Sequence, residues 1–89
     1  MHPTQSLSQI PIGQLARIVS VKQCAQMPDC ARQLSELGFL PDEHIVVLRR
    51  TMPGSDPLLV RIGVSTFALR LAEAACVEVA LGDGLISNA

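Results

Sequence analysis

Residues 37–43, with the sequence Leu-Gly-Phe-Leu-Pro-Asp-Glu, decide the fold because they indicate a helix that ends and leads directly into a strand. Leu37 closes an apolar helical pattern, and Gly38 readily adopts the left-handed conformation that terminates helices. Pro41 prevents the helix from resuming before the extended run Ile-Val-Val-Leu at 45–48. One short helix and a β-rich remainder follow from this junction. The sequence therefore predicts a mainly β protein with one short helix, folded as a small barrel.

Apolar patterns and turn residues on either side of the junction predict the other elements. The helix is expected to begin at Pro28 and to end near Leu37, with Ala31, Leu34 and Leu37 facing the core at a spacing of three. Strands are expected at 15–21, 45–50, 58–62, 66–70 and 76–79, and a single helical turn at 71–75.

The two ends of the chain receive separate interpretations. Leu7 and Ile10 are expected to pack on the barrel as an apolar plug. Residues 6–80 are expected to form the domain, and residues 81–89 a flexible C-terminal tail. With 89 residues in one domain, there is little interior for a deep active-site cavity.

Composition narrows the classes of function. The chain has two Phe and no Tyr or Trp, so it lacks an aromatic platform for stacking bases and an aromatic groove for proline-rich peptides. The net charge is −1, and the longest basic run is the Arg49-Arg50 pair. We therefore expect no nucleic-acid partner.

Three features favour a cytoplasmic protein. No apolar run approaches the roughly 20 residues that span a bilayer, so direct membrane insertion is not expected. The first residues lack the pattern of a secretory signal. The chain has three cysteines, an odd number that favours reduced thiols over a disulfide framework.

Four motifs occur in order along the chain: Gln-Ile-Pro-Ile-Gly-Gln at 9–14, the helix-to-strand junction at 34–43, Gly-Ser-Asp-Pro-Leu at 54–58, and Ala-Leu-Arg-Leu-Ala-Glu-Ala at 68–74. Taken together, they make the chain resemble the ferrous iron transport protein A (FeoA) family over about residues 6–80. The resemblance implies an SH3-like β-barrel in the bacterial cytosol. It also implies a non-enzymatic accessory protein whose partner is the FeoB-type membrane ferrous iron transporter with a G-protein domain.

The same resemblance extends to the C-terminal SH3-like domain of iron-dependent repressors. Such a repressor needs a helix-turn-helix ahead of this module, and the five residues before Ser6 are too few to form one. Regulation of DNA is therefore the weaker hypothesis. No Gly-rich phosphate loop is present, so the chain is not expected to hydrolyse GTP.

Contact with a partner is the favoured function, and the loop between the strands at 45–50 and 58–62 is the candidate surface. Its exposed turn residues and the basic pair at its base make up the predicted contact site: Arg49, Arg50, Pro53, Gly54, Asp56 and Pro57. A solvated charge pair is the simpler interpretation of the two arginines. Leu40, Leu58 and Leu59, together with backbone pairing at a strand edge, offer an alternative surface, although these leucines also suit a core.

Metal handling is the competing function. His44 and Cys76 are the candidate ligands, acting within one molecule or bridging two molecules as a metal-bridged homodimer. Cys24 and Cys30 are six residues apart with no second close pair, which differs from structural zinc sites. No cofactor is expected to be required, and a divalent metal such as zinc is the candidate ligand. Enzymatic activity is not expected, because no nucleophile and base occur in a recognisable pattern.

Overall fold

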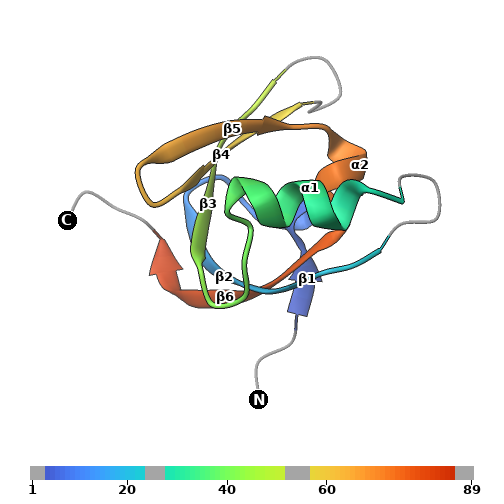
Figure 1. Cartoon of the computed structure of the whole chain (residues 1–89). Coiled ribbons are helices and arrows are strands. Elements are labelled where there is room, and N and C mark those ends of the chain that lie inside the picture. The colour runs from blue at the N-terminus through green and yellow to red at the C-terminus, as the bar shows by residue number, and fades with distance from the viewer. Residues whose placement is uncertain (1–3, 24–27, 52–56, 86–89) are drawn as a thin grey trace.

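The structure, a computed structural model of the chain, describes residues 4–23, 28–51 and 57–85. The elements, in chain order, are β1 (Thr4–Ser6), the 3-10 helix η1 (Leu7–Gln9), β2 (Gln14–Val21), α1 (Cys30–Leu37), β3 (His44–Arg50), β4 (Leu58–Ile62), β5 (Ser65–Leu69), α2 (Leu71–Ala74) and β6 (Val77–Leu85). The strands form one antiparallel sheet in the order β1-β6-β2-β3-β4-β5 (Figure 1). The predicted mainly β fold is confirmed.

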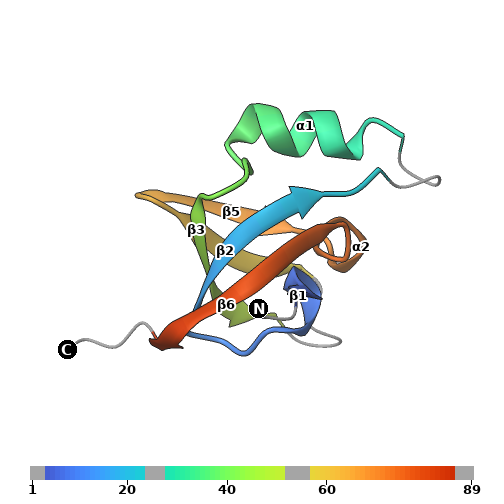
Figure 2. The same cartoon turned by 90° about the horizontal axis from the view of Figure 1, so that it is seen from below.

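Alternation along the strands places one face of the curved sheet against a single core. In β4, for example, Leu58, Val60 and Ile62 are buried while the residues between them are half-buried. The Phe39 and Phe67 rings meet within this core, with centroids 5.4 Å apart. Figures 1 and 2 show α1 lying alongside the strands and α2 at the connection from β5 to β6.

The N-terminal segment closes the core as predicted. Leu7 and Ile10 have no exposed surface and belong to the same apolar cluster as the strands. Ahead of them, β1 pairs with β6 through Thr4–Ala80 and Ser6–Glu78, a strand that the sequence did not predict. The chain therefore enters the sheet before it forms the plug.

The junction at the end of α1 has the predicted geometry. Gly38 has a φ angle of 115°, in the left-handed region that glycine tolerates best. Its N–H donates to the Ser35 carbonyl at 3.0 Å, and the Phe39 N–H donates to the Leu34 carbonyl at 2.9 Å. This is the Schellman pattern, in which the buried side chains of Phe39 and Leu34 also pack in the core.

Two details of α1 differ from the prediction. Pro28 and Asp29 lie in the turn before the helix, which begins at Cys30. Leu37 is 52% exposed, and the buried helical side chains are Cys30 and Leu34, four residues apart. A spacing of three turns each successive side chain about 60° away around the helix, so the three predicted positions could not all face the core.

β6 is longer than the closing strand that the sequence predicted. It runs from Val77 to Leu85 and pairs with β2 from Val21–Val77 to Gln14–Leu85. Residues 81–85, predicted to be part of the tail, are thus within the sheet. Residues 86–89 lie outside the described residues.

Candidate functional site

Much of the predicted contact loop lies outside the described residues, namely Pro53, Gly54 and Asp56. Its base is described and is closed by hydrogen bonds. The Thr51 N–H and hydroxyl both donate to the Pro57 carbonyl, at 3.3 Å and 2.8 Å. Pro57 itself is exposed at the start of β4.

The two arginines of the predicted contact site have different environments. The Arg50 guanidinium donates from Nη2 to the Ser8 carbonyl at 3.0 Å and to the Ile10 carbonyl at 2.7 Å. It therefore ties the end of β3 to the plug segment. Arg49 is exposed. Consecutive residues of a strand point to opposite faces of the sheet, so Arg49, opposite Leu59, and Arg50, opposite the buried Leu58, lie in these different settings.

Arg49 belongs to a wider basic surface. Residues 44–51 and 57–70 contain four arginines and no Asp or Glu, although the whole chain has a net charge of −1. The ion pairs between described residues involve other basic groups: Arg17 with Asp42, Lys22 with Glu78, and Arg32 with Asp29. The β3-β4-β5 part of the sheet is therefore basic, and Glu73 of α2, whose Oε1 accepts from the Arg70 N–H at 2.8 Å, is the carboxylate beside it.

Of the three leucines that the sequence suggested as an alternative contact surface, one is exposed. Leu58 is fully buried, Leu59 is half-buried and Leu40 is 45% exposed. Leu58 thus belongs to the core, which was the alternative interpretation of these residues.

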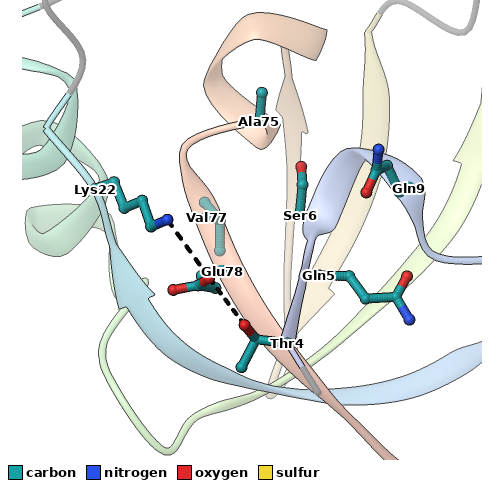
Figure 3. Close-up of a pocket in the computed structure, with 8 residues that line it drawn as sticks. All are labelled: Thr4, Gln5, Ser6, Gln9, Lys22, Ala75, Val77 and Glu78. Carbon is teal, nitrogen blue, oxygen red and sulfur yellow. Dashed lines mark hydrogen bonds and ion pairs between the residues drawn. The ribbon is translucent and has the colours of Figure 1, made fainter.

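A polar pocket of about 210 Å³ lies between β1, β2 and β6. Figure 3 shows Thr4 and Lys22 converging on the Glu78 carboxylate, with the Gln5 amide directed away from it. The Thr4 hydroxyl donates to Glu78 Oε2 at 2.9 Å, and Lys22 Nζ lies 3.5 Å from the same oxygen. Ser20 Oγ donates to Oε1 at 3.4 Å. Three strands supply this cluster.

The neighbours of Glu78 stabilise its charged form. The Thr4 hydrogen bond is the largest cause that lowers the pKa of Glu78 below its ordinary value of 4.5, and the Lys22 charge acts in the same direction. Partial desolvation acts against both. The carboxylate is therefore an acceptor already occupied by the protein's own donors, which suits a structural role better than proton transfer.

This cluster, and the hydrogen bonds from Arg50 to the Ser8 and Ile10 carbonyls, were not predicted from the sequence. Thr4, Ser20, Lys22 and Glu78 meet because β6 pairs with β1 on one side and with β2 on the other. Glu78 is opposite Ser6 in one ladder and opposite Ser20 in the other. The only sequence signal is a single acidic residue in a β-branched strand, and this signal does not reveal its partners.

The two predicted metal ligands are not brought together. His44 lies opposite Arg17 of β2, and the Cys76 carbonyl accepts a hydrogen bond from the Lys22 N–H. Five residues of strand separate these two points, on the order of 15 Å. The Cys76 side chain is also 8% exposed, and its thiol donates to the Ala72 carbonyl at 3.5 Å.

No group of three or more His, Cys, Asp or Glu in residues 4–23, 28–51 and 57–85 is placed to hold a metal ion. Cys24 lies outside those ranges.

A second pocket, of about 250 Å³, opens at the start of α1, lined by Pro28, Asp29, Cys30, Gln33 and Glu73. In the same ranges, no helix is long and apolar enough to cross a membrane.

The curved antiparallel sheet, the short helix after β2 and the N-terminal plug define a small SH3-like β-barrel. The FeoA domain model matches residues 5–81, so the chain belongs to the FeoA domain family. A comparison with curated protein sequences gave no match.

Solved structures agree with this assignment. FeoA of Stenotrophomonas maltophilia, solved in complex with zinc and described as an SH3 domain protein and a candidate ferrous iron transport activating factor, is 37% identical, with a TM-score of 0.76 over 84% of this chain and 88% of that one. Iron(II) transport protein A from Clostridium thermocellum is 30% identical, with a TM-score of 0.73 over 86% of this chain and 45% of that one. A manganese-dependent transcriptional repressor, 20% identical, shares the fold over 91% of this chain and 43% of its own, with a TM-score of 0.76.

Proposed function

We propose that this chain is a non-enzymatic cytosolic accessory protein of bacterial ferrous iron transport, which acts by contact with a FeoB-type membrane transporter that carries a G-protein domain. The observation that carries the proposal is the FeoA domain match over residues 5–81, together with the 37% identity to the S. maltophilia protein. That relative is described as a candidate activating factor for ferrous iron transport.

The surface of the barrel supports action by contact. The two pockets described above are small, and in the pocket between β1, β2 and β6 Glu78 pairs with Lys22 and accepts a hydrogen bond from Thr4. By contrast, the arginine side chains of the β3-β4-β5 surface form no ion pair with a carboxylate among the described residues. Such a surface favours association with an acidic partner and accelerates encounter at low salt.

The proposal is tested by uptake of radioactive ferrous iron in cells that lack this chain. We expect uptake to fall and to be restored by the wild-type chain supplied in trans. Restoration should fail when the transporter itself is also deleted, because the chain is proposed to act only through it. Unchanged uptake in the deletion strain, with the transporter expressed at its normal level, would contradict the proposal.

Metal handling is the alternative, and the zinc complex of the S. maltophilia relative is the observation that favours it. Titration of the reduced protein with zinc, and separately with ferrous iron under anaerobic conditions, distinguishes the two functions. The contact function predicts no tight stoichiometric binding. Tight binding abolished by His44→Ala or Cys76→Ser would favour metal handling, with Cys30→Ser as the control for a general effect of losing a thiol.

A further inference from the structure

β5 is an outer strand of the sheet, and its outer side is accessible. It is the last strand in the sheet order, next to β4 alone, and Figure 1 shows it at the top of the view. Ser65, Thr66 and Ala68 are exposed, and Val64 in the preceding turn is 100% exposed. Phe67 and Leu69 point to the core side. One long side of this strand is thus available to another chain.

The turn before β5 determines which backbone groups face outward. Gly63 and Val64 form a two-residue connection, with Gly63 at a φ angle of 59°, and Ile62 lies opposite Ser65. In a hairpin of this kind the residues that flank the turn form a hydrogen-bonded pair, and such pairs alternate along the ladder. Thr66 and Ala68 therefore direct their N–H and C=O groups away from β4. No backbone bond outside the ladder involves either residue within the described ranges.

β5 also lacks the usual protection of an edge strand. Natural sheets protect exposed edges with proline, charged side chains, bulges or very short strands. The sequence of β5 is Ser-Thr-Phe-Ala-Leu, with no proline or charge, and its five pairs with β4 run without a register shift. The opposite edge, β1, has only three residues. The β5 edge is the better acceptor for an added strand.

The charges near β5 indicate what kind of strand it accepts. Arg61 lies opposite Thr66, and Arg70 follows the last residue of β5. Arg49 is opposite Leu59, which is opposite Ala68. An added strand would lie about 4.8 Å beyond β5, within reach of the Arg61 and Arg70 side chains. A second copy added edge to edge would bring the same arginines of both copies together, and this repulsion disfavours self-association.

We propose that the β5 edge binds an extended acidic segment of a partner protein as an additional antiparallel or parallel strand. Backbone hydrogen bonds to Thr66 and Ala68 would give the pairing, and Arg61 and Arg70 would select acidic side chains. The inference rests on the proposed contact function for its biological partner and identifies the surface used. In this proposal the β5 edge is the principal contact, in place of the loop at 53–57.

The first test uses a synthetic eight-residue peptide of alternating Glu and Val, titrated into isotopically labelled protein at low salt. We expect the largest amide shifts at Val64–Ala68 and slower hydrogen exchange of the Thr66 and Ala68 amides. A peptide with Lys in place of Glu should bind more weakly. Shifts confined to β1 or α1, no shifts with about 1 mM peptide, or equal binding of the Lys peptide would each overturn the proposal.

Matched variants separate the backbone from the charge contribution. Ala68→Pro removes the outward N–H and should weaken peptide binding by about fivefold or more, whereas Ala68→Ser should leave it nearly unchanged. Arg61→Gln with Arg70→Gln should weaken binding by about fivefold, and Arg32→Gln on α1 is the charge control. If Ala68→Pro does not fold, the exchange rates of the wild-type amides with and without peptide still decide the point.

The same variants in cells distinguish this inference from the proposed function. Chains carrying Ala68→Pro or the double arginine change should fail to restore ferrous uptake in the deletion strain, although they accumulate normally. Full restoration by both would overturn the β5 proposal and leave the accessory function intact. A membrane surface is the other outcome. If anionic lipid vesicles displace the peptide completely, and the peptide does not slow exchange of the Thr66 and Ala68 amides, the arginines bind lipid and the β5 proposal is wrong.

Discussion

Arg50 donates two hydrogen bonds to the Ser8 and Ile10 carbonyls, and it thereby joins the end of β3 to the N-terminal plug. The adjacent Arg49 is exposed and has no ion pair among the described residues. Two identical neighbours thus differ in role: one holds the fold together and the other contributes to the basic surface. The sequence shows only a charged pair, because nothing local indicates that a carbonyl some 40 residues earlier is the acceptor.

Exchange of each arginine for glutamine tests this division. Arg50→Gln should lower the free energy of unfolding by about 1–3 kcal/mol, since the Ser8 and Ile10 carbonyls lose the charged donor that they share. Arg49→Gln should change it by less than about 0.5 kcal/mol. Chemical denaturation of both variants beside the wild type gives the comparison. Equal stability losses would show that Arg50 has no special structural role.

Glu78 gives a pH-dependent prediction. Its pKa in the folded protein lies below the ordinary value of 4.5, mainly through Thr4, so the ionised group adds stability above the unfolded pKa. This stability is lost as the pH falls below 4.5 through the folded pKa. Thr4→Val should raise the pKa of Glu78 and reduce that loss.

An NMR titration of the Glu78 side-chain carbonyl measures the pKa directly. Thr66→Val is the matched control, because it makes the same chemical change at an exposed strand residue with no carboxylate opposite it. A Glu78 pKa that is the same in Thr4→Val and the wild type would show that the hydrogen bond does not set it.

At the scale of elements, α1 depends on how it ends. Gly38 stops the helix in a left-handed conformation, and the next residue, Phe39, then enters the core beside Leu34. A Cβ added at Gly38 would meet nothing within 4 Å, so any cost of substitution comes from the backbone conformation and not from crowding. This makes the position a clean test of conformational strain.

Gly38→Val should destabilise the protein by about 1 kcal/mol or more, because a β-branched residue strongly disfavours a positive φ angle. For a domain of this size, the melting temperature should fall by roughly 4–8 °C per kcal/mol. Gly38→Asn should cost less, since Asn tolerates the left-handed region. Indistinguishable melting temperatures of the Val and Asn variants would contradict this account of the helix end.

Elements with a strong local signal were predictable from the sequence. β4 was predicted with its observed limits, since β-branched and apolar residues run between Pro57 and Gly63. β1 and the extension of β6 were missed, because their pairing depends on contact between the two ends of the chain. The burial of α1 was partly wrong, since neighbouring strands and not sequence spacing alone determine which helical face is covered.

At the scale of the whole molecule, the charges are unevenly distributed. Arginines on β3, on β4 and just after β5 form a basic part of the sheet, with Glu73 as the carboxylate beside Arg70. Only the Arg49-Arg50 pair was recognisable from the sequence, because Arg61 and Arg70 join it through strand pairing and not through sequence proximity. The fold was thus more predictable than the surface, since function depends on which exposed residues become neighbours.

The most direct test of the account is equilibrium binding of the purified chain to the purified FeoB-type transporter in lipid nanodiscs. We predict saturable binding that weakens as salt is raised from about 50 to 500 mM, and that weakens further with Ala68→Pro but not with Ala68→Ser. Arg32→Gln should bind as the wild type does. Absence of binding at low salt, with both proteins folded and the transporter active in GTP hydrolysis, would contradict the claim that this protein acts by contact.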